Sequence, residues 1–461
     1  MDFSKEYAAT AVRAKFEDLP SQAVDQAKRF ILDTLGVGIA GSVTPEAEKI
    51  VSVVRNWGGK PDSTLLVFGD KLPSIHAALA NSVLFHALDF DDTHDGAVIH
   101  GYVTNLSAAL AVAEKMGGVT GKDLVLALNL GLDLTYRLGL AVGSAPEFTK
   151  REVHFVRTAV CGAFGASLVA SKLRGLSADA TNNALGIVLS QIGGTRQVVV
   201  DSAMTKRYQP AFMTYAGLLS AELSAAGVSG CQDVFEGKYG YFNIYWNGAY
   251  QREELTRDLG RHFEGVNTSF KPYPCCRYTH GAIDATLDIL QKHKLSPSSV
   301  NRVDVHVTKQ SFFDAVSRPL VLTDNPTMDG QFSIPYTVAS AILDGYVFLD
   351  SFDPATVRNE KRTELAKKVT VIRDLPVVDR KSLGPVRVEI YTADGCRSTE
   401  VRQFKGSPEQ PLSWEGCIVK FKRCCRHAHS RISEDKQDKL IDIISRIEEV
   451  PDVKTIMDCL V

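Results

Sequence analysis

The sequence predicts a mainly α-helical protein with a smaller α+β domain, and three observations lead to this fold class. Up to about residue 265, apolar residues recur at helical spacing in segments rich in Ala and Leu. Between about 270 and 400, two segments alternate apolar and polar residues at the period of a strand. From Ser413 onward the pattern is helical again, so the last segment is expected to pack on the first domain. We therefore expect a discontinuous helical domain, 1–268 and 405–461, and an α+β domain, 269–404.

The first helices of the helical domain have recognisable ends. The segment 21–42 places apolar residues near one face, and the next helix has Thr44 as N-cap, Pro45 in its first turn and Gly58-Gly59 as its stop. Further helices are expected at 74–90, 106–116, 123–142, 159–173 and 212–226. Small residues dominate "CGAFGASLVASKL", which favours close helix packing.

The α+β domain is predicted from its alternating segments. These are "VNRVDVHVTKQ" and "GPVRVEIYTADGCRSTEVR", and the second contains an Asp394-Gly395 turn. Helical stretches are expected between them at 336–342 and 355–368, and before them at 280–292.

Composition excludes several classes of partner. The formal net charge of −2 gives no reason to expect nucleic acid or an anionic membrane surface. The most apolar long run, 123–143, is interrupted by Asn129, Asp133 and Arg137, which favours a buried helix over a membrane span. Nine cysteines, two pairs of them adjacent, do not resemble a disulfide framework. We expect a cytoplasmic enzyme with reduced thiols.

The stretch "FHALDFDDTHDGAVIH", residues 85–100, concentrates acids and histidines. If 74–93 forms one helix, His86, Asp89 and Thr93 lie on one face. Clustered carboxylates repel one another unless they are solvated, paired with cations or functional. An exposed acidic helix end is the plainer alternative, but helix C-termini disfavour negative charge.

A second interpretation of this stretch is a metal site. Asp91 to Asp95 match the DDxxD pattern by which terpenoid synthases hold Mg²⁺ on a diphosphate, and carboxylate oxygens suit Mg²⁺. Such sites usually need a second acidic motif, and the sequence has none.

Basic residues form the next candidate group. "MTKRYQP" contains Lys206, and "FKPYPCCRYTHGAIDA" contains Lys271, Arg277 and His280. Lys271 precedes two prolines and so lies outside a helix, while the helix that follows offers N–H groups to an anion. These residues form a candidate carboxylate site, with ordinary surface Lys and Arg as the alternative.

Tyr336 is the last candidate. It follows Pro335 at a predicted helix start, where a phenol can point into a cleft and exchange a proton. A tyrosine packed in an amphipathic helix explains the same spacing equally well.

Taken together, "HALDFDDTH", "TKRYQP", "FKPYPCCRYTHGAIDA" and "QFSIPYTVASAILDG" resemble the MmgE/PrpD family in order and spacing. That family includes 2-methylcitrate dehydratase, cis-aconitate decarboxylase and iminodisuccinate epimerase. The resemblance implies a helical domain built from both chain ends, an inserted α+β lid domain and a homodimer. It also implies that the enzyme uses neither a metal nor an organic cofactor.

Position by position, the resemblance assigns catalytic roles to the following residues: Asp89, Thr93, His100, Lys206, Lys271 and Tyr336. Lys206, Lys271, Arg277 and His280 are the expected substrate-binding groups. His100 or Asp89 would act as base and Tyr336 or His100 as acid, while the cations would offset charge that develops on carbon.

The chain departs from the family pattern at two positions. Gln209 and Val156 stand where histidine is common, and His154 lies two residues before Val156. These changes concern the substrate rather than the fold. The expected function is a lyase on a small di- or tricarboxylate, most simply a 2-methylcitrate dehydratase. Decarboxylation of cis-aconitate and epimerisation of iminodisuccinate are the alternatives, and a Mg²⁺-dependent terpenoid synthase is a remote one.

Overall fold

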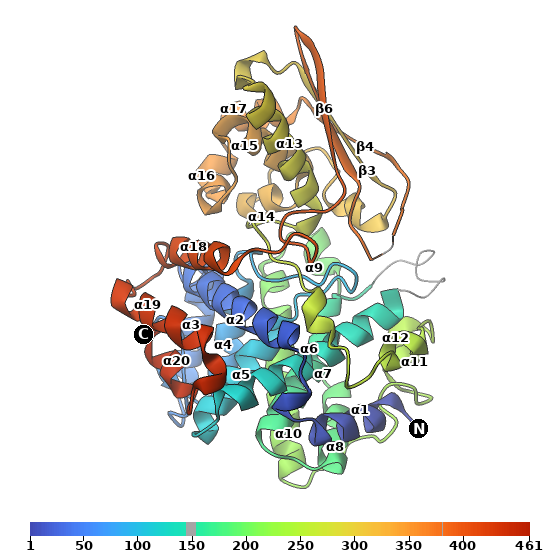
Figure 1. Ribbon diagram of the computed structural model, residues 1–461, viewed down its shortest axis with the longest axis vertical. Helices are drawn as coiled ribbons and strands as arrows, with labels where there is room; N and C mark the ends of the chain where they lie inside the picture. Colours follow the sequence, from blue (N-terminus) through green and yellow to red (C-terminus); the bar gives the residue numbers. More distant parts are fainter. Residues whose placement is uncertain (144–153, 380) are drawn as a thin grey trace. The chain divides into compact units, whose positions relative to one another are not determined.

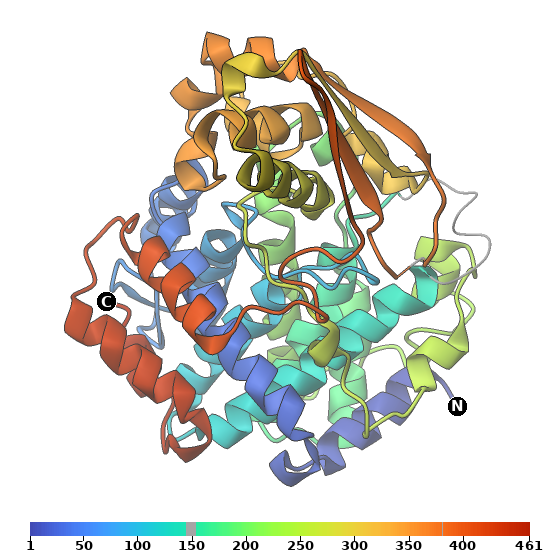
Figure 2. The same cartoon turned by 45° about the horizontal axis from the view of Figure 1, so that its top comes forward.

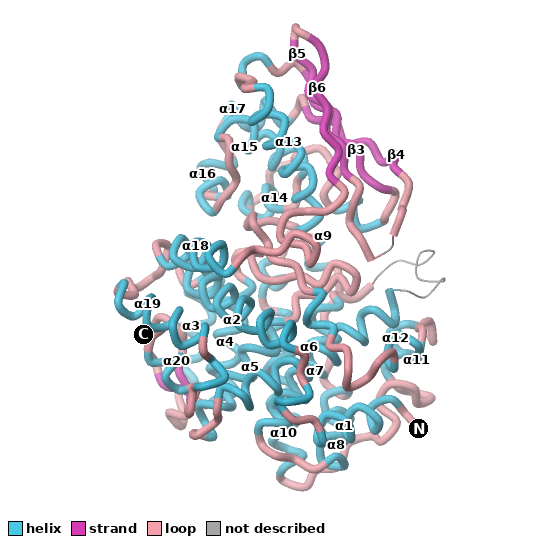
Figure 3. The backbone as a smooth tube through the Cα atoms, viewed as in Figure 1, coloured by secondary structure: helices cyan, strands magenta, loops and turns pink. Residues whose placement is uncertain are grey.

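The computed structural model describes residues 1–143, 154–379 and 381–461, which form two compact units (Figure 1). The first unit contains Met1–Thr268 and Ser413–Val461, and the second contains Ser269–Leu412. The protein is mainly α-helical with a smaller α+β part, as the sequence predicts. Figure 3 shows that the longer strands all belong to the second unit.

The first unit is a large assembly of helices, with one short hairpin of two strands, β1 (Ser63–Thr64) and β2 (Lys71–Leu72). Its α-helices in chain order are α1 (Phe3–Arg13), α2 (Ser21–Gly41), α3 (Pro45–Trp57), α4 (Ser74–His86), α5 (Tyr102–Met116), α6 (Gly121–Gly143), α7 (Arg157–Leu173), α8 (Ala178–Leu189), α9 (Gln197–Val200), α10 (Gln209–Ala225), α11 (Tyr241–Trp246), α12 (Arg252–Thr256), α18 (Trp414–Cys425), α19 (Glu434–Ser445) and α20 (Lys454–Asp458).

The predicted helix ends of α3 are confirmed. The Thr44 hydroxyl accepts a hydrogen bond from the Ala47 N–H, Pro45 opens the helix, and Gly58 ends it with a φ of +58°. Helix α8 was not predicted, although Ser177 caps it by accepting from the Ala180 N–H. The sequence alone therefore gives some ends well and overlooks a whole helix.

Small residues allow the central helices to approach closely, as predicted. A Cβ on Gly165 of α7 would lie 2.1 Å from Thr135 Oγ1 and 2.8 Å from the Gly131 carbonyl oxygen of α6. These distances are far below van der Waals contact, so only glycine fits here. Helix α6 is long and apolar enough to cross a membrane by composition, but its apolar window is entirely buried in the structure.

The C-terminal segment packs on the N-terminal helices of the same unit. Helix α18 runs beside α2, as Figure 2 shows. A buried ion pair joins the two helices, with Lys420 Nζ 2.8 Å from Asp33 Oδ1. The segment Ser413–Val461 is therefore part of the first unit and contributes buried residues to its core.

The second unit has a four-stranded sheet in the order β4-β3-β5-β6. Its strands are β3 (Arg302–Thr308), β4 (Val369–Leu375), β5 (Val386–Thr392) and β6 (Gly395–Val401). Strand β3 pairs with β4 in parallel and with β5 antiparallel, and β5 and β6 form the predicted hairpin. The sheet packs against α13 (His280–His293) and α15 (Ile334–Asp344).

Two expectations for local structure are wrong, and one strand was not predicted. A single helix over 74–93 does not form, because α4 ends at His86 and Asp89 adopts a left-handed φ of +52°. The helix expected at 355–368 is two short ones, α16 (Pro354–Val357) and α17 (Glu360–Ala366), since Asn359 caps a new start. Strand β4 was not predicted, because residues 369–375 form a strand through their pairing with β3.

The second unit also contains a short helix, α14 (Pro326–Gln331).

Candidate active site

The acidic stretch forms a loop that returns on itself after α4. A β-bridge pairs His94 with Ile99, which brings the end of the stretch back toward its beginning. The His100 N–H donates to Thr158 Oγ1 at 3.0 Å, which fastens the end of the loop to the first turn of α7. This fold places side chains that are far apart in the loop beside one another.

The loop and the residues around it form a network of polar side chains, which consists of His86, Asp89, Asp91, His100, Lys206 and Arg207. On one side of this network, Asp91 lies between two imidazoles. Asp91 Oδ2 lies 2.7 Å from His86 Nδ1 and 3.2 Å from His100 Nδ1, and the two rings meet edge-on with centroids 4.8 Å apart. Asp91 and His86 are fully buried, whereas the His100 side chain keeps 17% of its exposure. His100 is thus the more open imidazole of the pair.

The other side consists of Asp89 between two cations. The short 3₁₀ helix η3 (Met204–Arg207) supplies both cations, and Asp89 Oδ1 accepts from Lys206 Nζ at 2.5 Å and from Arg207 at 2.6 Å. Lys206 Nζ also lies 3.1 Å from His86 Nε2, which joins the two sides. All the side chains on this side are nearly excluded from solvent.

These contacts determine the protonation of the inner groups. His86 donates from Nδ1 to Asp91 and accepts at Nε2 from the Lys206 ammonium, so it is neutral. Burial, with Lys206 adding to it against the pull of Asp91, lowers the pKa of His86 to about 3. Burial alone would raise the pKa of Asp91, but His100 and His86 hold it well below its ordinary value. Asp91 is therefore a carboxylate.

The same atoms could be considered for a metal, because ligand atoms of His86, Asp91 and His100 lie within 4.8 Å of one another. The Lys206 ammonium, 3.1 Å from His86 Nε2, places a positive charge beside any cation bound there. A hydrogen-bonded network accounts for the same contacts without that repulsion.

The DDxxD pattern does not build a shared Mg²⁺ site in this structure. Asp91 faces the imidazoles, whereas Asp92 accepts from the Gly101 and Tyr102 N–H groups at the start of α5 and from the Tyr136 hydroxyl. Asp92 thus holds a helix end, as expected for an acid outside the pocket.

Asp92 gives a testable pH dependence of stability. Burial, followed by the nearby charge of Asp91, raises the pKa of Asp92 to about 8. The folded state then binds a proton that the unfolded state releases near pH 4, so this group's contribution to stability is lost as pH rises from 4 to 8. Asp92→Asn has no titrating group at this position, so it should not show this loss of stability. We expect its unfolding free energy, relative to wild type, to increase by up to ~4 kcal/mol between pH 5 and 8.

Urea unfolding at several pH values measures this difference. Asp179→Asn, on the exposed surface of α8, is the matched control and should track wild type. Equal pH slopes for Asp92→Asn and wild type would contradict the prediction.

Thr93 lies close in sequence to the network residues, but the structure shows no hydrogen bond between its side chain and the network. Thr93 is 5% exposed, and its hydroxyl has no hydrogen-bond partner within the described residues. Its catalytic role stays a prediction.

The four remaining candidates lie in the second unit, so their convergence with the network stays a prediction. Lys271 is buried there. Arg277 donates to the Lys405 carbonyl at 2.8 Å and lies 3.3 Å from His280 Nδ1, and His280 Nε2 lies 3.2 Å from the Cys275 carbonyl.

Tyr336 belongs to the hydrophobic core of the second unit. It is fully buried, and its phenol donates to the Ser351 carbonyl oxygen. Burial raises the pKa of Tyr336 to about 12. As placed, the phenol resembles a packed core tyrosine more than a proton donor, and its role as acid stays a prediction.

The two departures from the family pattern contact neighbouring carbonyls of one backbone segment. The Val156 N–H donates to the Gly194 carbonyl at 2.9 Å, and Gln209 Nε2 donates to the Thr195 carbonyl at 3.0 Å. Gln209 Oε1 is buried and has no partner in the part of the chain that the structure describes. Both positions therefore changed around the same small region.

Three members of the network were missed as site residues by the sequence analysis: His86, Asp91 and Arg207. His86 and Asp91 lie three residues before and two after Asp89, a spacing visible in the sequence. What the spacing did not reveal is the turn at Asp89 and the return of the loop.

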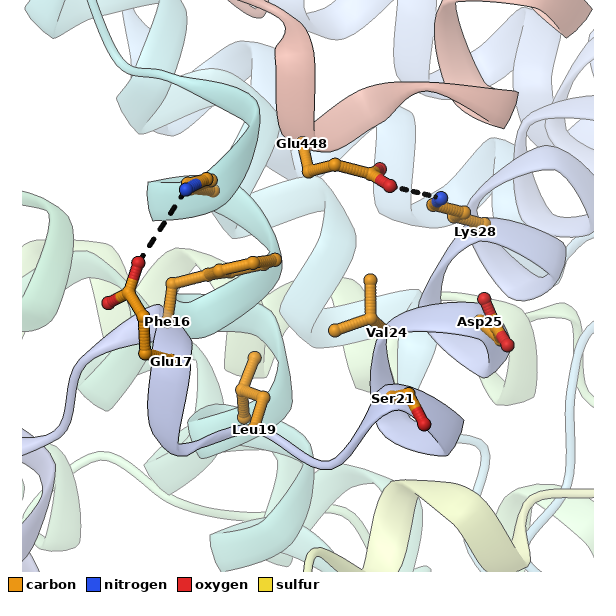
Figure 4. Close-up of a pocket in the computed structure, with 9 residues that line it drawn as sticks. Phe16, Glu17, Leu19, Ser21, Val24, Asp25, Lys28 and Glu448 are labelled. Carbon is orange, nitrogen blue, oxygen red and sulfur yellow. Dashed lines mark hydrogen bonds and ion pairs between the residues drawn. The ribbon is translucent and has the colours of Figure 1, made fainter.

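A separate surface pocket of about 360 Å³ lies near the start of α2 (Figure 4). Its two lysines are each paired with a glutamate, Lys28 with Glu448 at 2.7 Å and Lys122 with Glu17 at 3.5 Å, and Asp25 adds a further carboxylate. None of the network residues lines it. Both cations of the pocket are therefore already neutralised, which disfavours an anionic substrate there.

Comparison with known proteins gives matches along nearly the whole chain. A cis-aconitate decarboxylase-like protein, oryM, of Aspergillus oryzae is 27% identical, covering 96% of this chain and 94% of its own length. The cis-aconitate decarboxylase of Aspergillus terreus is 26% identical (96% and 93%), and that of Mus musculus 28% (95% and 89%). Residues 5–253 match the MmgE/PrpD N-terminal domain and residues 273–449 the MmgE/PrpD C-terminal domain. The chain therefore belongs to the MmgE/PrpD family.

Proposed function

We propose that this lyase of the MmgE/PrpD family removes CO₂ from a small tricarboxylate of the cis-aconitate type, without a metal or an organic cofactor. The named relatives, matched over at least 95% of this chain, support decarboxylation over the 2-methylcitrate dehydration that the sequence analysis favoured. Dehydration and epimerisation remain outcomes of the test below.

Decarboxylation needs one proton delivered to carbon. The bond to the departing carboxylate breaks, CO₂ leaves, and the electron pair stays on carbon until a proton arrives there. A positioned side chain that supplies this proton contributes about 10²- to 10⁴-fold in rate. His100 is the candidate donor, because it is the more open imidazole of the network and its inner nitrogen faces a carboxylate.

The charge balance of the network indicates what else the substrate requires. The cations Lys206 and Arg207 are offset by Asp89 and Asp91. Extra positive charge for a tricarboxylate then comes from protonated His100 and from cations outside the network. This supports the predicted contribution of Lys271 and Arg277 from the second unit, with electrostatic stabilisation of the developing carbanion as its physical basis.

Product analysis in D₂O tests the proposal. The purified protein is incubated with cis-aconitate, 2-methylcitrate, citrate or iminodisuccinate, with and without EDTA, and products are followed by NMR. We expect CO₂ release from cis-aconitate with one deuterium incorporated at carbon, unaffected by EDTA. Interconversion of 2-methylcitrate with its dehydration product, or deuterium exchange into iminodisuccinate alone, would overturn decarboxylation, and loss of activity in EDTA would overturn metal independence.

The expected homodimer, the cytoplasmic location and the absence of nucleic-acid and membrane partners also stay predictions. Size-exclusion chromatography with light scattering measures the first of these directly.

A further inference from the structure

We propose that Asp91 is a positioning residue, whose carboxylate holds His100 with Nδ1–H directed inward so that Nε2 carries the reacting proton. This inference deepens the proposed function and rests on it, because it assumes that His100 is the proton donor. The sequence analysis considered Asp91 as part of the DDxxD pattern and did not include it among the catalytic candidates.

The first argument is geometric. Asp91 is fully buried, and its Oδ2 atom lies 2.7 Å from Nδ1 of His86, where the two form a hydrogen bond, and 3.2 Å from Nδ1 of His100, where they form an ion-pair contact. His100 Nδ1 is buried and makes no hydrogen bond among the described residues, so Asp91 Oδ2 is an acceptor within its reach. An ionised carboxylate only accepts hydrogen bonds, so this contact favours hydrogen on the ring nitrogen that faces it. In neutral His100 this leaves the lone pair on Nε2, where the second proton binds.

The second argument separates the two imidazoles. His86 Nε2 is occupied by the Lys206 ammonium at 3.1 Å, and the ring is almost fully excluded from solvent. His86 therefore has no position for a substrate and serves to orient Asp91. His100 has 17% of its side chain exposed and its backbone fastened to Thr158, so its ring is both held and open.

The third argument concerns charge. Asp91 Oδ1 is buried and has no hydrogen-bond partner among the described residues. Since neutral His86 brings no charge, protonated His100 is the direct counter-ion that Asp91 gains in the reactive state. The imidazolium is the form that can deliver a proton, and Asp91 Oδ2 lies 3.2 Å from its Nδ1.

Other charged groups lie around this pair. They are Lys206 and Arg207 from η3, Asp33 from α2, Lys420 from α18, and Asp89 and Asp92 from the loop. Asp91 is the carboxylate that faces the His100 ring nitrogen.

Asp91→Asn tests the proposal, because it keeps the shape and removes the charge. We expect kcat to fall on the order of a hundredfold with little change in KM. Asp179→Asn is the control, an exposed acid on α8 that contacts neither imidazole, and it should keep kcat near wild type.

Two-bond ¹H–¹⁵N spectra of protein labelled with ¹⁵N-histidine provide a readout without substrate. We expect neutral His100 to be the Nδ1–H form in wild type and a mixture of tautomers in Asp91→Asn. An Nε2–H form in wild type, or a tautomer that Asp91→Asn leaves unchanged, would overturn the proposal. If the wild-type protein acts on none of the four carboxylates, the proposed function fails, while the tautomer still reports on Asp91.

Discussion

His100→Asn is expected to lower kcat for the tricarboxylate by about 10²- to 10⁴-fold, the contribution of a positioned general acid. Asparagine keeps a donor near the position of Nδ1, 3.2 Å from Asp91 in the native protein, and lacks the second nitrogen that carries the proton. The side chain is partly open, so we expect little loss of folding stability. KM should rise, because the substrate loses the positive charge of protonated His100. Steady-state kinetics together with thermal unfolding measure both quantities.

His262→Asn serves as the control for this change. His262 belongs to the same unit, its side chain is 40% exposed, and it pairs at 3.4 Å with Glu264 rather than with the network. Its activity should equal that of wild type. Turnover by His100→Asn within a few-fold of wild type would refute the assignment of His100 as proton donor.

Lys420→Met is expected to lower the free energy of unfolding by about 3–5 kcal/mol, because it leaves the buried Asp33 carboxylate without its partner. Lys420 Nζ lies 2.8 Å from Asp33 Oδ1, and the side chains are 7% and 0% exposed. Burial raises the pKa of Asp33, while Lys420 counteracts the rise. Without Lys420, folding requires a protonated Asp33, so the loss of stability should grow as pH increases above 4.

Lys420 also supports the active-site loop. Its Nζ atom donates to the Phe90 carbonyl at 3.0 Å and lies 3.9 Å from the centre of the Phe90 ring. Phe90 lies in the sequence between Asp89 and Asp91, the two acids of the network. We therefore expect Lys420→Met to lower kcat as well as stability. The double variant Asp33→Asn/Lys420→Met should regain part of the lost stability, since it removes the unpaired charge.

Lys422→Met, on the same helix, is the matched control for Lys420→Met. Lys422 is 42% exposed and pairs with the exposed Asp438, so its loss should cost at most about 1 kcal/mol. Urea unfolding of the wild type and the three variants measures these differences. Equal stabilities for the Lys420 and Lys422 variants would contradict the importance of the buried pair.

The sequence predicted the fold class and many of the helices because their signals are local. The ends of α3 depend on Thr44, Pro45 and Gly58, and each acts within one turn. Strand β4 was missed because its partner β3 lies more than sixty residues earlier in the chain. Pairing over such distances leaves no periodic trace in the segment itself.

The site divides in the same way. Asp89, Lys206 and His100 could be named from motifs, but the place of Asp91 could not be derived from its position next to Asp92. The left-handed turn at Asp89 and the bridge between His94 and Ile99 send the two neighbouring acids to different partners. The expected helix over 74–93 would have turned Asp91 away from His86, and its failure is what creates the network.

The packing of α18 on α2 also has a consequence for the order of events during protein synthesis. A nascent chain of 412 residues already contains every residue of the network, yet it lacks Lys420, which holds the Phe90 carbonyl. Asp33 then remains without its ammonium partner until the final segment leaves the ribosome. The first unit begins at Met1 but completes its core only when the last segment has been synthesised. A chain truncated after the second unit should therefore be degraded by proteases rather than form a smaller enzyme.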